Sequence, residues 1–255
     1  MFLKLLKYDL KSIYKPILIL DIVMVFLSTL TVLTAKNFSP NNNIIFIGTV
    51  MFLIIATLVS ALATVSIYIF NIFRSYAIGI YGKDGYLLNT LPVTAKQIVL
   101  SKISSAFIMG IVTLFFGLLC IPIVFTLMST DIVYIINRLN NNIQNLNLFL
   151  FAVMFIIMFI VSAIYTIVKI YALISISSIA KFEKFKFAVG IVIYILTQLV
   201  ERVFLNLFIS YITLDNLAIQ NISLYFLSYL AFYLIVGFIW YYICVYLIDK
   251  KLYVQ

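Results

Sequence analysis

The chain has no histidine, and among its 255 residues it has only two cysteines. Without histidine it has no imidazole ligand for a metal ion and no Ser-His-Asp triad. Two cysteines provide neither the four ligands of a structural zinc site nor a disulfide framework. Cys120 and Cys244 both lie in apolar runs, and we interpret them as packing residues. We therefore predict neither a catalytic site nor a metal site in this chain.

Charged side chains are also scarce. They make up 10% of the chain, whereas hydrophobic residues make up 65% and the mean hydropathy is +1.22. A soluble globular domain has about 25% charged and about 45–50% apolar residues, so this composition excludes a soluble, a disordered and a disulfide-stapled secreted protein. Because one membrane crossing takes about 20 apolar residues, the chain has room for about six crossings. We predict an all-α membrane protein with one domain over residues 1–255.

Six apolar runs separated by polar breaks predict the transmembrane helices. We place the spans at about 16–35, 44–73, 103–128, 148–175, 188–210 and 223–247.

The residues before the first span show a different pattern. In residues 2–15, Leu6, Leu10 and Ile13 recur at helical spacing, while lysines form a stripe on another face. This pattern predicts an amphipathic helix that lies at the level of the lipid headgroups. Pro16 is expected to start the first span, where its missing N–H costs no hydrogen bond.

The positions of the basic residues predict the orientation in the membrane. With the N-terminus in the cytoplasm, 14 of the 17 lysines and arginines lie at or near the inner face and three fall toward the outside. The inner set is Lys4, Lys7, Lys11, Lys15, Arg74, Lys83, Lys96, Lys102, Lys169, Lys181, Lys184, Lys186, Lys250 and Lys251, and the outer set is Lys36, Arg138 and Arg202. Both termini are therefore predicted to be cytoplasmic. The net charge of +9 is scattered over the span ends, so we do not predict nucleic-acid binding.

The cytoplasmic loop between the second and third spans, residues 74–102, is the most informative segment. Three of the eight glycines fall within residues 79–85, where they allow tight turns. Leu91 precedes Pro92 and is forced out of the helical region, and Thr94 is placed to cap a helix that leads into the third span.

Within this loop, residues 86–91 present apolar side chains to the cytosol. An exposed apolar surface of this kind indicates a site where another protein docks. A loop that lies on the lipid headgroups is the alternative, and the pattern alone leaves it open.

The run Tyr-Gly-Lys-Asp-Gly-Tyr-Leu-Leu-Asn-Thr-Leu-Pro-Val-Thr at residues 81–94, followed by a span led by Lys102, resembles the cytoplasmic coupling loop of ABC type-2 export permeases of Gram-positive bacteria. The resemblance covers the whole chain in architecture but only residues 81–102 as a motif. It implies two permease copies, identical or related, above two ABC ATPase chains in the bacterial cytoplasmic membrane, with this loop docked in a cleft of the ATPase. The implied ATPase-coupling residues are Tyr81, Gly82, Gly85, Tyr86, Leu87, Leu91 and Pro92.

Hydrolysis of ATP is expected on the partner. A P-loop requires Gly-x-x-x-x-Gly-Lys-Ser/Thr, and the chain's one Gly-Lys pair, Gly82-Lys83, is followed by Asp84. We therefore expect this chain to be no enzyme and to bind no cofactor, with ATP and Mg²⁺ held by the ATPase.

Polar residues inside the spans are candidates for a translocation path, because burying them in lipid is unfavourable. The resemblance, in which the second and fifth spans line the route, favours this role. Two alternatives stay open: Glu201 and Arg202 snorkel to the outer interface, and the hydroxyl groups of the second span pack helices together. The candidates are Thr57, Ser60, Thr64, Gln198, Glu201, Arg202 and Asn206.

Two other charged residues lie within predicted spans. Lys169 is near the inner end of the fourth span, where we expect it to snorkel to the interface. Asp21 is early in the first span, and pairing with a lysine of residues 2–15 or with another span are both open.

These patterns and the resemblance predict a permease that moves an amphipathic or hydrophobic cargo by alternating access. A toxin-like or bacteriocin-like peptide, a drug-like amphiphile and a lipid all fit the apolar and hydroxyl-bearing lining. The alternative is an ATP-independent membrane protein, namely a secondary transporter, an immunity factor or a sensor. A secondary transporter needs buried ionisable groups near the membrane midplane, and the spans contain few of them.

Overall fold

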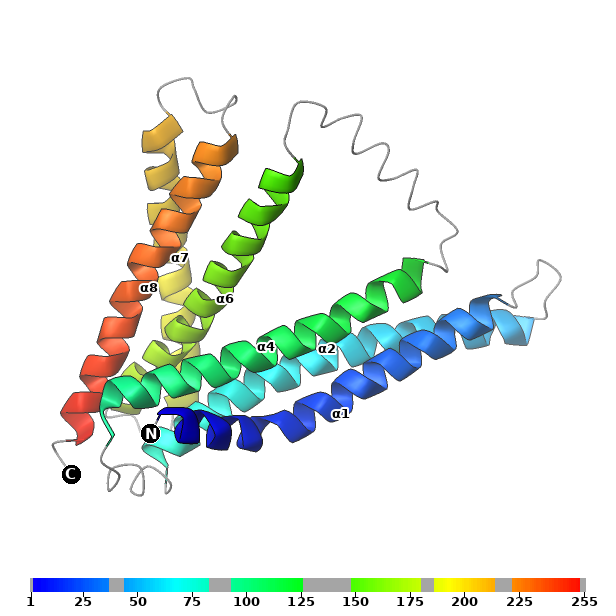
Figure 1. Cartoon of the computed structure of the whole chain (residues 1–255), viewed down its shortest axis with the longest axis horizontal. Helices are drawn as coiled ribbons and strands as arrows, with labels where there is room; N and C mark the ends of the chain where they lie inside the picture. The colour runs from blue at the N-terminus through cyan, green and yellow to red at the C-terminus, as the bar shows by residue number, and fades with distance from the viewer. Residues whose placement is uncertain are drawn as a thin grey trace. The chain divides into compact units, whose positions relative to one another are not determined.

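A computed structural model describes residues 2–36, 44–82, 93–125, 148–179, 186–213 and 222–252. In these ranges the chain forms six helices, and each is long and apolar enough to cross a membrane. The predicted all-α membrane fold with six spans is confirmed. The helices are α1 (Phe2–Lys36), α2 (Ile44–Tyr81), α4 (Ala95–Phe125), α6 (Leu148–Ile179), α7 (Lys186–Thr213) and α8 (Ile222–Leu252) (Figure 1).

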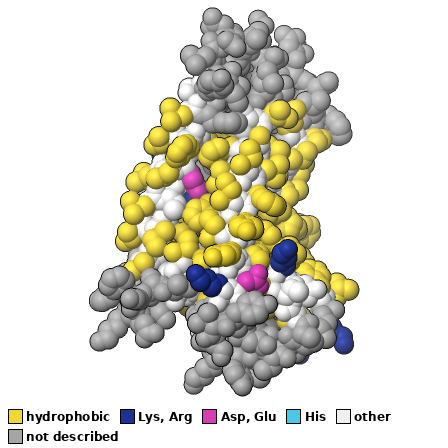
Figure 2. Space-filling view, turned by 90° about the vertical axis from the view of Figure 1, so that its left-hand side faces the viewer, with side chains coloured by type: hydrophobic (Ala, Val, Ile, Leu, Met, Phe, Trp, Pro, Cys, Tyr) yellow, Lys and Arg dark blue, Asp and Glu magenta, His cyan; other side chains and the backbone are white. Residues whose placement is uncertain are grey.

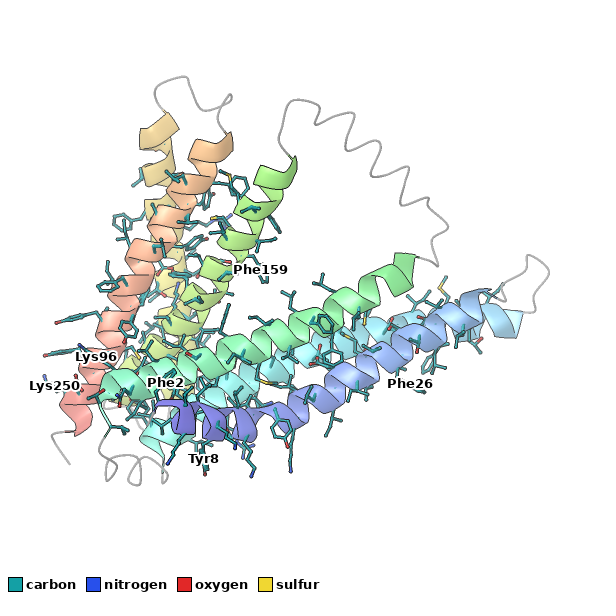
Figure 3. The ribbon with its side chains drawn as sticks, in the orientation of Figure 1. Phe2, Tyr8, Phe26, Lys96, Phe159 and Lys250 are labelled. Carbon is teal, nitrogen blue, oxygen red and sulfur yellow. The ribbon has the colours of Figure 1, made fainter. Side chains whose placement is uncertain are left out.

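Large apolar side chains cover the outer faces of these helices. Phe26 of α1 and Phe159 of α6 point away from their helices and are largely exposed (Figure 3). Hydrophobic side chains also form much of the described part of the face drawn in Figure 2. A helix can present such an apolar surface to lipid because its backbone N–H and C=O groups form hydrogen bonds with one another within the helix.

The first helix is not divided at Pro16, where the sequence predicted a boundary between two helices. The structure has one helix from Phe2 to Lys36, with Pro16 inside it, in place of a separate surface helix over residues 2–15. Ile13 and Ile17, on either side of the proline, are buried against Met109 of α4. This packing holds the chain helical although the proline removes one hydrogen bond. The lysines at 4, 7, 11 and 15 are exposed, and their position at the headgroup level remains a prediction.

The predicted loop at residues 74–102 is shorter in the structure, because both flanking helices extend into it. The second helix continues to Tyr81 and α4 begins at Ala95. The expected cap is present: the backbone N–H of Gln97 donates to Thr94 Oγ1 over 3.4 Å. Leu91 and Pro92 lie outside the described residues.

The chain forms two compact units. The α6–α8 unit comprises Met1–Leu6, Phe73–Phe107 and Asn147–Gln255, and the α1–α2–α4 unit comprises Lys7–Ile72 and Ile108–Leu146. Both α2 and α4 run from one unit into the other, and the single membrane domain remains a prediction.

Within the α1–α2–α4 unit the three helices lie side by side (Figure 1). Ile13, Ile17 and Met109 form a buried cluster against which Tyr68 of α2 packs. Gly110 is required beside it, because a Cβ atom at this position would lie 2.6 Å from the Tyr68 hydroxyl. A larger residue at this position would force the Tyr68 ring to shift.

Candidate functional site: a buried ion pair between α6 and α7

Within the α6–α8 unit the three helices pack together, and two of them carry opposite charges that meet in the interior. Lys169 Nζ of α6 lies 2.5 Å from Glu201 Oε2 of α7. The side chain of Lys169 is 1% exposed and that of Glu201 is 15% exposed. Both charges are largely removed from solvent and lipid, so each depends on the other for compensation.

Two neutral side chains also donate hydrogen bonds to the Glu201 carboxylate. The Tyr165 hydroxyl of α6 donates to Glu201 Oε2, the oxygen that also accepts from Lys169. The indole Nε1–H of Trp240 on α8 donates to Glu201 Oε1 over 2.8 Å. Side chains from two neighbouring helices therefore donate to both carboxylate oxygens. These hydrogen bonds fix the position of the Glu201 carboxylate.

The ammonium group of Lys169 has partners besides Glu201. It donates to Gln198 Oε1 over 2.9 Å. It also lies 5.2 Å from the ring centre of Tyr194 and 5.9 Å from that of Tyr165, within the range of cation–π attraction. The rings and the amide replace part of the water shell that a buried ammonium group loses.

Both residues of the ion pair lie inside the apolar segments of their helices. The membrane-spanning part of α6 is Val153–Ser178 and that of α7 is Val189–Leu207. At about 1.5 Å per residue, Lys169 lies about 14 Å from the end at Ser178 and Glu201 about 18 Å from the start at Val189. Both charged residues therefore lie within the candidate spans and not in the connections between them.

This placement corrects the expectation for Lys169. The lysine does not snorkel to the interface, because its ammonium group is enclosed and bonded to α7. Removing it from the inner set leaves 13 (14 minus Lys169) basic residues inside against three outside. The sequence did contain a signal for the pair: Tyr165 and Lys169 are four residues apart on one span, and Gln198 and Glu201 are three apart on the next.

The other candidates of the fifth span do not join this site. Gln198 and Glu201 both accept from Lys169, although Gln198 is exposed, as are Arg202 and Asn206 on the surface of the described chain. The snorkelling alternative therefore does not describe Glu201, whose carboxylate is bonded to α6 and α8. A role of these residues in a translocation path remains a prediction.

The candidates of the second span lie in the other compact unit. Ser60 and Thr64 are buried and Thr57 is partly exposed. Each hydroxyl donates to a backbone carbonyl of its own helix, three residues earlier. The contact of Thr64 Oγ1 with Met24 Sδ of α1 at 4.0 Å agrees with helix packing. Their role as path lining also remains a prediction.

Two of the seven predicted coupling residues are described. The ring of Tyr81 meets that of Tyr76 edge to face, with centres 6.3 Å apart. Gly82 is exposed, and its N–H donates to the Ile78 carbonyl over 3.0 Å. A Cβ atom on Gly82 would lie 2.5 Å from that carbonyl oxygen, so the end of α2 requires glycine. The remaining five, Gly85, Tyr86, Leu87, Leu91 and Pro92, lie outside the described residues.

A second buried polar cluster fastens the end of α2 to α6 and α8. The side chain of Tyr76 is fully buried, and its ring stacks on Tyr171 of α6 with centres 4.1 Å apart. The Tyr76 hydroxyl bonds Ser175 Oγ of α6 at 2.7 Å and Cys244 Sγ of α8 at 2.9 Å. Cys244 is thus more than the plain packing residue that the sequence indicated.

The start of α4 is fastened to the same cluster. Lys102 Nζ donates to the carbonyl and hydroxyl oxygens of Ser75 on α2, at 3.2 and 3.3 Å. The Tyr171 hydroxyl donates to the Lys102 carbonyl over 3.3 Å. Gly79 leaves room for this lysine, since a Cβ atom there would lie 3.0 Å from Nζ.

The site provides two opposite charges and several hydrogen-bonding groups. Within the described ranges no three acidic or cysteine side chains gather to hold a metal ion. What the ion pair can do is bind a polar or charged group in the membrane, or separate when the helices move. No family of proteins, no curated protein and no solved structure matched this chain in comparisons with each.

Proposed function

We propose that this chain is the membrane-embedded permease subunit of a bacterial ABC exporter. Two permease copies, identical or related, would work above two ABC ATPase chains that bind ATP and Mg²⁺. The observation that carries the proposal is the anchoring of both helices that flank residues 83–92. Tyr76 joins the end of α2 to α6 and α8, and the start of α4 is joined to α6 through Tyr171.

This anchoring supports a mechanical role for the connection between α2 and α4. A force applied to residues 83–92 acts on Ser75 and Lys102, and from Lys102 on Tyr171 of α6. Two residues before Tyr171 on the same helix is Lys169, which holds Glu201. Closure of the ATPases would thereby move α6 relative to α7 and open or close the interior of the α6–α8 unit. Such a step is the basis of alternating access.

The cargo of the proposed exporter is amphipathic or hydrophobic. The apolar surfaces of the helices allow such a molecule to enter from the lipid, and the Lys169–Glu201 pair provides polar partners inside. A toxin-like or bacteriocin-like peptide fits this description best, and drug-like amphiphiles and lipids also fit it.

The test is whether residues 83–92 bind an ATPase. The full chain is co-expressed with a candidate ABC ATPase from the same organism and purified, and the ATPase recovered is normalised to inserted permease. Leu91→Asp should abolish recovery, because an apolar anchor is replaced by a charge that the cleft must desolvate. Lys83→Ala, a change at the rim of the same segment, should retain it. Full recovery and cargo-stimulated ATP hydrolysis with Leu91→Asp would reject the proposal.

A second function, a secondary transporter that needs no ATPase, is favoured by the Lys169–Glu201 pair. Ionisable groups within membrane spans are typical of proton-coupled transport. The two functions separate in liposomes that contain the purified chain alone. Cargo uptake driven by a pH gradient without any ATPase would support the secondary transporter, whereas uptake only with the ATPase and ATP would support the exporter.

A further inference from the structure

The α1–α2–α4 unit contains a carboxyl group that the proposed function does not use. The side chain of Asp21 on α1 is 1% exposed, and its Oδ2 atom is enclosed without a hydrogen-bond partner among the described residues. On the same face of α1, Ile17 packs against Met109 of α4 and Met24 touches Thr64 of α2. Asp21 lies between these two contacts along the helix.

No basic side chain of the spanning segments is available to Asp21. Residues 44–72 of α2 and 108–125 of α4 contain no charged residue. The nearest lysine on α1, Lys15, is exposed and lies six residues earlier, about 9 Å along the helix axis and on another face. The pairing that the sequence left open is therefore not present among the described residues.

The titratable side chains of this unit that lie on α2 and α4 include a tyrosine and a cysteine, and neither of these forms a cation. Tyr68 of α2 packs on the Ile13, Ile17 and Met109 cluster. Cys120 of α4 accepts from the Ser28 hydroxyl over 3.5 Å. Asp21 therefore has no positive partner on α1, α2 or α4 within the described ranges.

A bound metal ion does not fit the surroundings of Asp21 either. A hard cation takes several oxygen ligands. The next buried hydroxyl group on this face of α1 is that of Ser28, about 10 Å further along the axis, and it donates to the Val25 carbonyl.

Enclosing a charged carboxylate without a partner is strongly unfavourable, whereas a protonated carboxyl group is neutral and can be enclosed at a lower cost. We propose that Asp21 is an intramembrane proton-binding site that carries its proton at neutral pH.

The lipid-soluble reagent dicyclohexylcarbodiimide provides a direct test on the unaltered chain in liposomes. The proton of a protonated carboxyl group passes to a carbodiimide nitrogen while a carboxyl oxygen bonds to the central carbon. The acyl group of the aspartate then moves from this oxygen to a nitrogen of the reagent. The product is a stable adduct that retains every atom of the reagent. At neutral pH, peptide mass spectrometry should find this adduct on Asp21, and labelling should decrease as the pH rises.

Glu201 is the matched control, because it is also buried but is paired with Lys169. It should be labelled several-fold less than Asp21 in the same sample, and the Asp21→Asn variant should lose the Asp21 adduct. A water-soluble carbodiimide with an added amine should leave Asp21 unmodified. Labelling of Asp21 no stronger than that of Glu201, or strong labelling by the water-soluble reagent, would overturn the proposal.

Thermal stability in detergent provides an independent measurement. Asparagine closely matches a neutral aspartic acid in shape, so Asp21→Asn should melt close to the wild type, whereas Glu201→Gln should melt at a clearly lower temperature. An equally large decrease for Asp21→Asn would mean that Asp21 is charged and paired with a cation, and would reject the proton-binding site.

Discussion

Lys169 of α6 and Glu201 of α7 form an ion pair inside the apolar spans, with their charged atoms 2.5 Å apart. The pair is further held by donors from α6 and α8, and α7 contributes an amide acceptor. Removing one partner would leave the other as an uncompensated buried charge. This dependence leads to the first prediction.

Glu201→Gln and Lys169→Leu should each lower the free energy of unfolding by about 3–5 kcal/mol, the range found when one partner of a buried ion pair is removed. The double variant should recover most of that loss, since it contains no buried charge. Thermal unfolding in detergent measures all three variants. Arg202→Gln, one residue from Glu201 but exposed, is the control and should change little. Additive losses in the double variant would show that the two residues do not interact.

Trp240 is the chain's single tryptophan and donates its indole N–H to Glu201. Intrinsic fluorescence therefore reports on the ion-pair site. Glu201→Gln should shift the emission maximum to shorter wavelengths, because the excited indole loses a negative acceptor at its nitrogen. The emission of Arg202→Gln should match that of the wild type. Equal shifts in both variants would place Trp240 away from the carboxylate.

The sequence predicted the number and class of the helices because apolar runs of sufficient length admit few other structures in lipid. It also predicted the cap at Thr94, a local contact. The predicted spans stop at residues 73 and 103, short of the helix ends, because Ser75, Lys96 and Lys102 make these ends polar while packing keeps them helical. The Lys169–Glu201 pair depends on the register between two helices, which no local pattern determines.

Tyr76→Phe should lower the free energy of unfolding by about 1 kcal/mol, because it removes a buried hydroxyl with two partners while Ser175 retains its bond to the Tyr171 carbonyl. Tyr76→Ala should cost roughly 3–5 kcal/mol, because a cavity replaces the stacked ring. Thermal unfolding in detergent measures both variants.

The thiol of Cys244 provides a second measurement on the same variants. It should resist a maleimide in the wild type and react in Tyr76→Ala. The exposed Tyr242→Phe is the control and should leave both stability and thiol reactivity unchanged. A reactive Cys244 in the wild type would contradict the buried cluster.

The distribution of lysine and arginine predicts that both termini are cytoplasmic. Single cysteines introduced at Asn42, Asn141 and Asn216, in a chain without Cys120 and Cys244, should react with an impermeant maleimide in intact cells. Cysteines at Lys184 and Lys251 should react only after the membrane is opened. Labelling of the residue 184 variant from outside would reverse the predicted orientation.

The position of the ion pair on consecutive helices has a consequence for how the chain is synthesised. On the translocon scale an isolated lysine or acidic residue at a helix centre disfavours insertion by about 2.5–3.5 kcal/mol. The helix that contains Glu201 also has the least apolar candidate span of the six described helices. The helix with Lys169 leaves the ribosome first, and its charge attracts the carboxylate that follows. We therefore expect the two helices to enter the bilayer as a hairpin, so that the pair which stabilises the finished protein also favours its insertion.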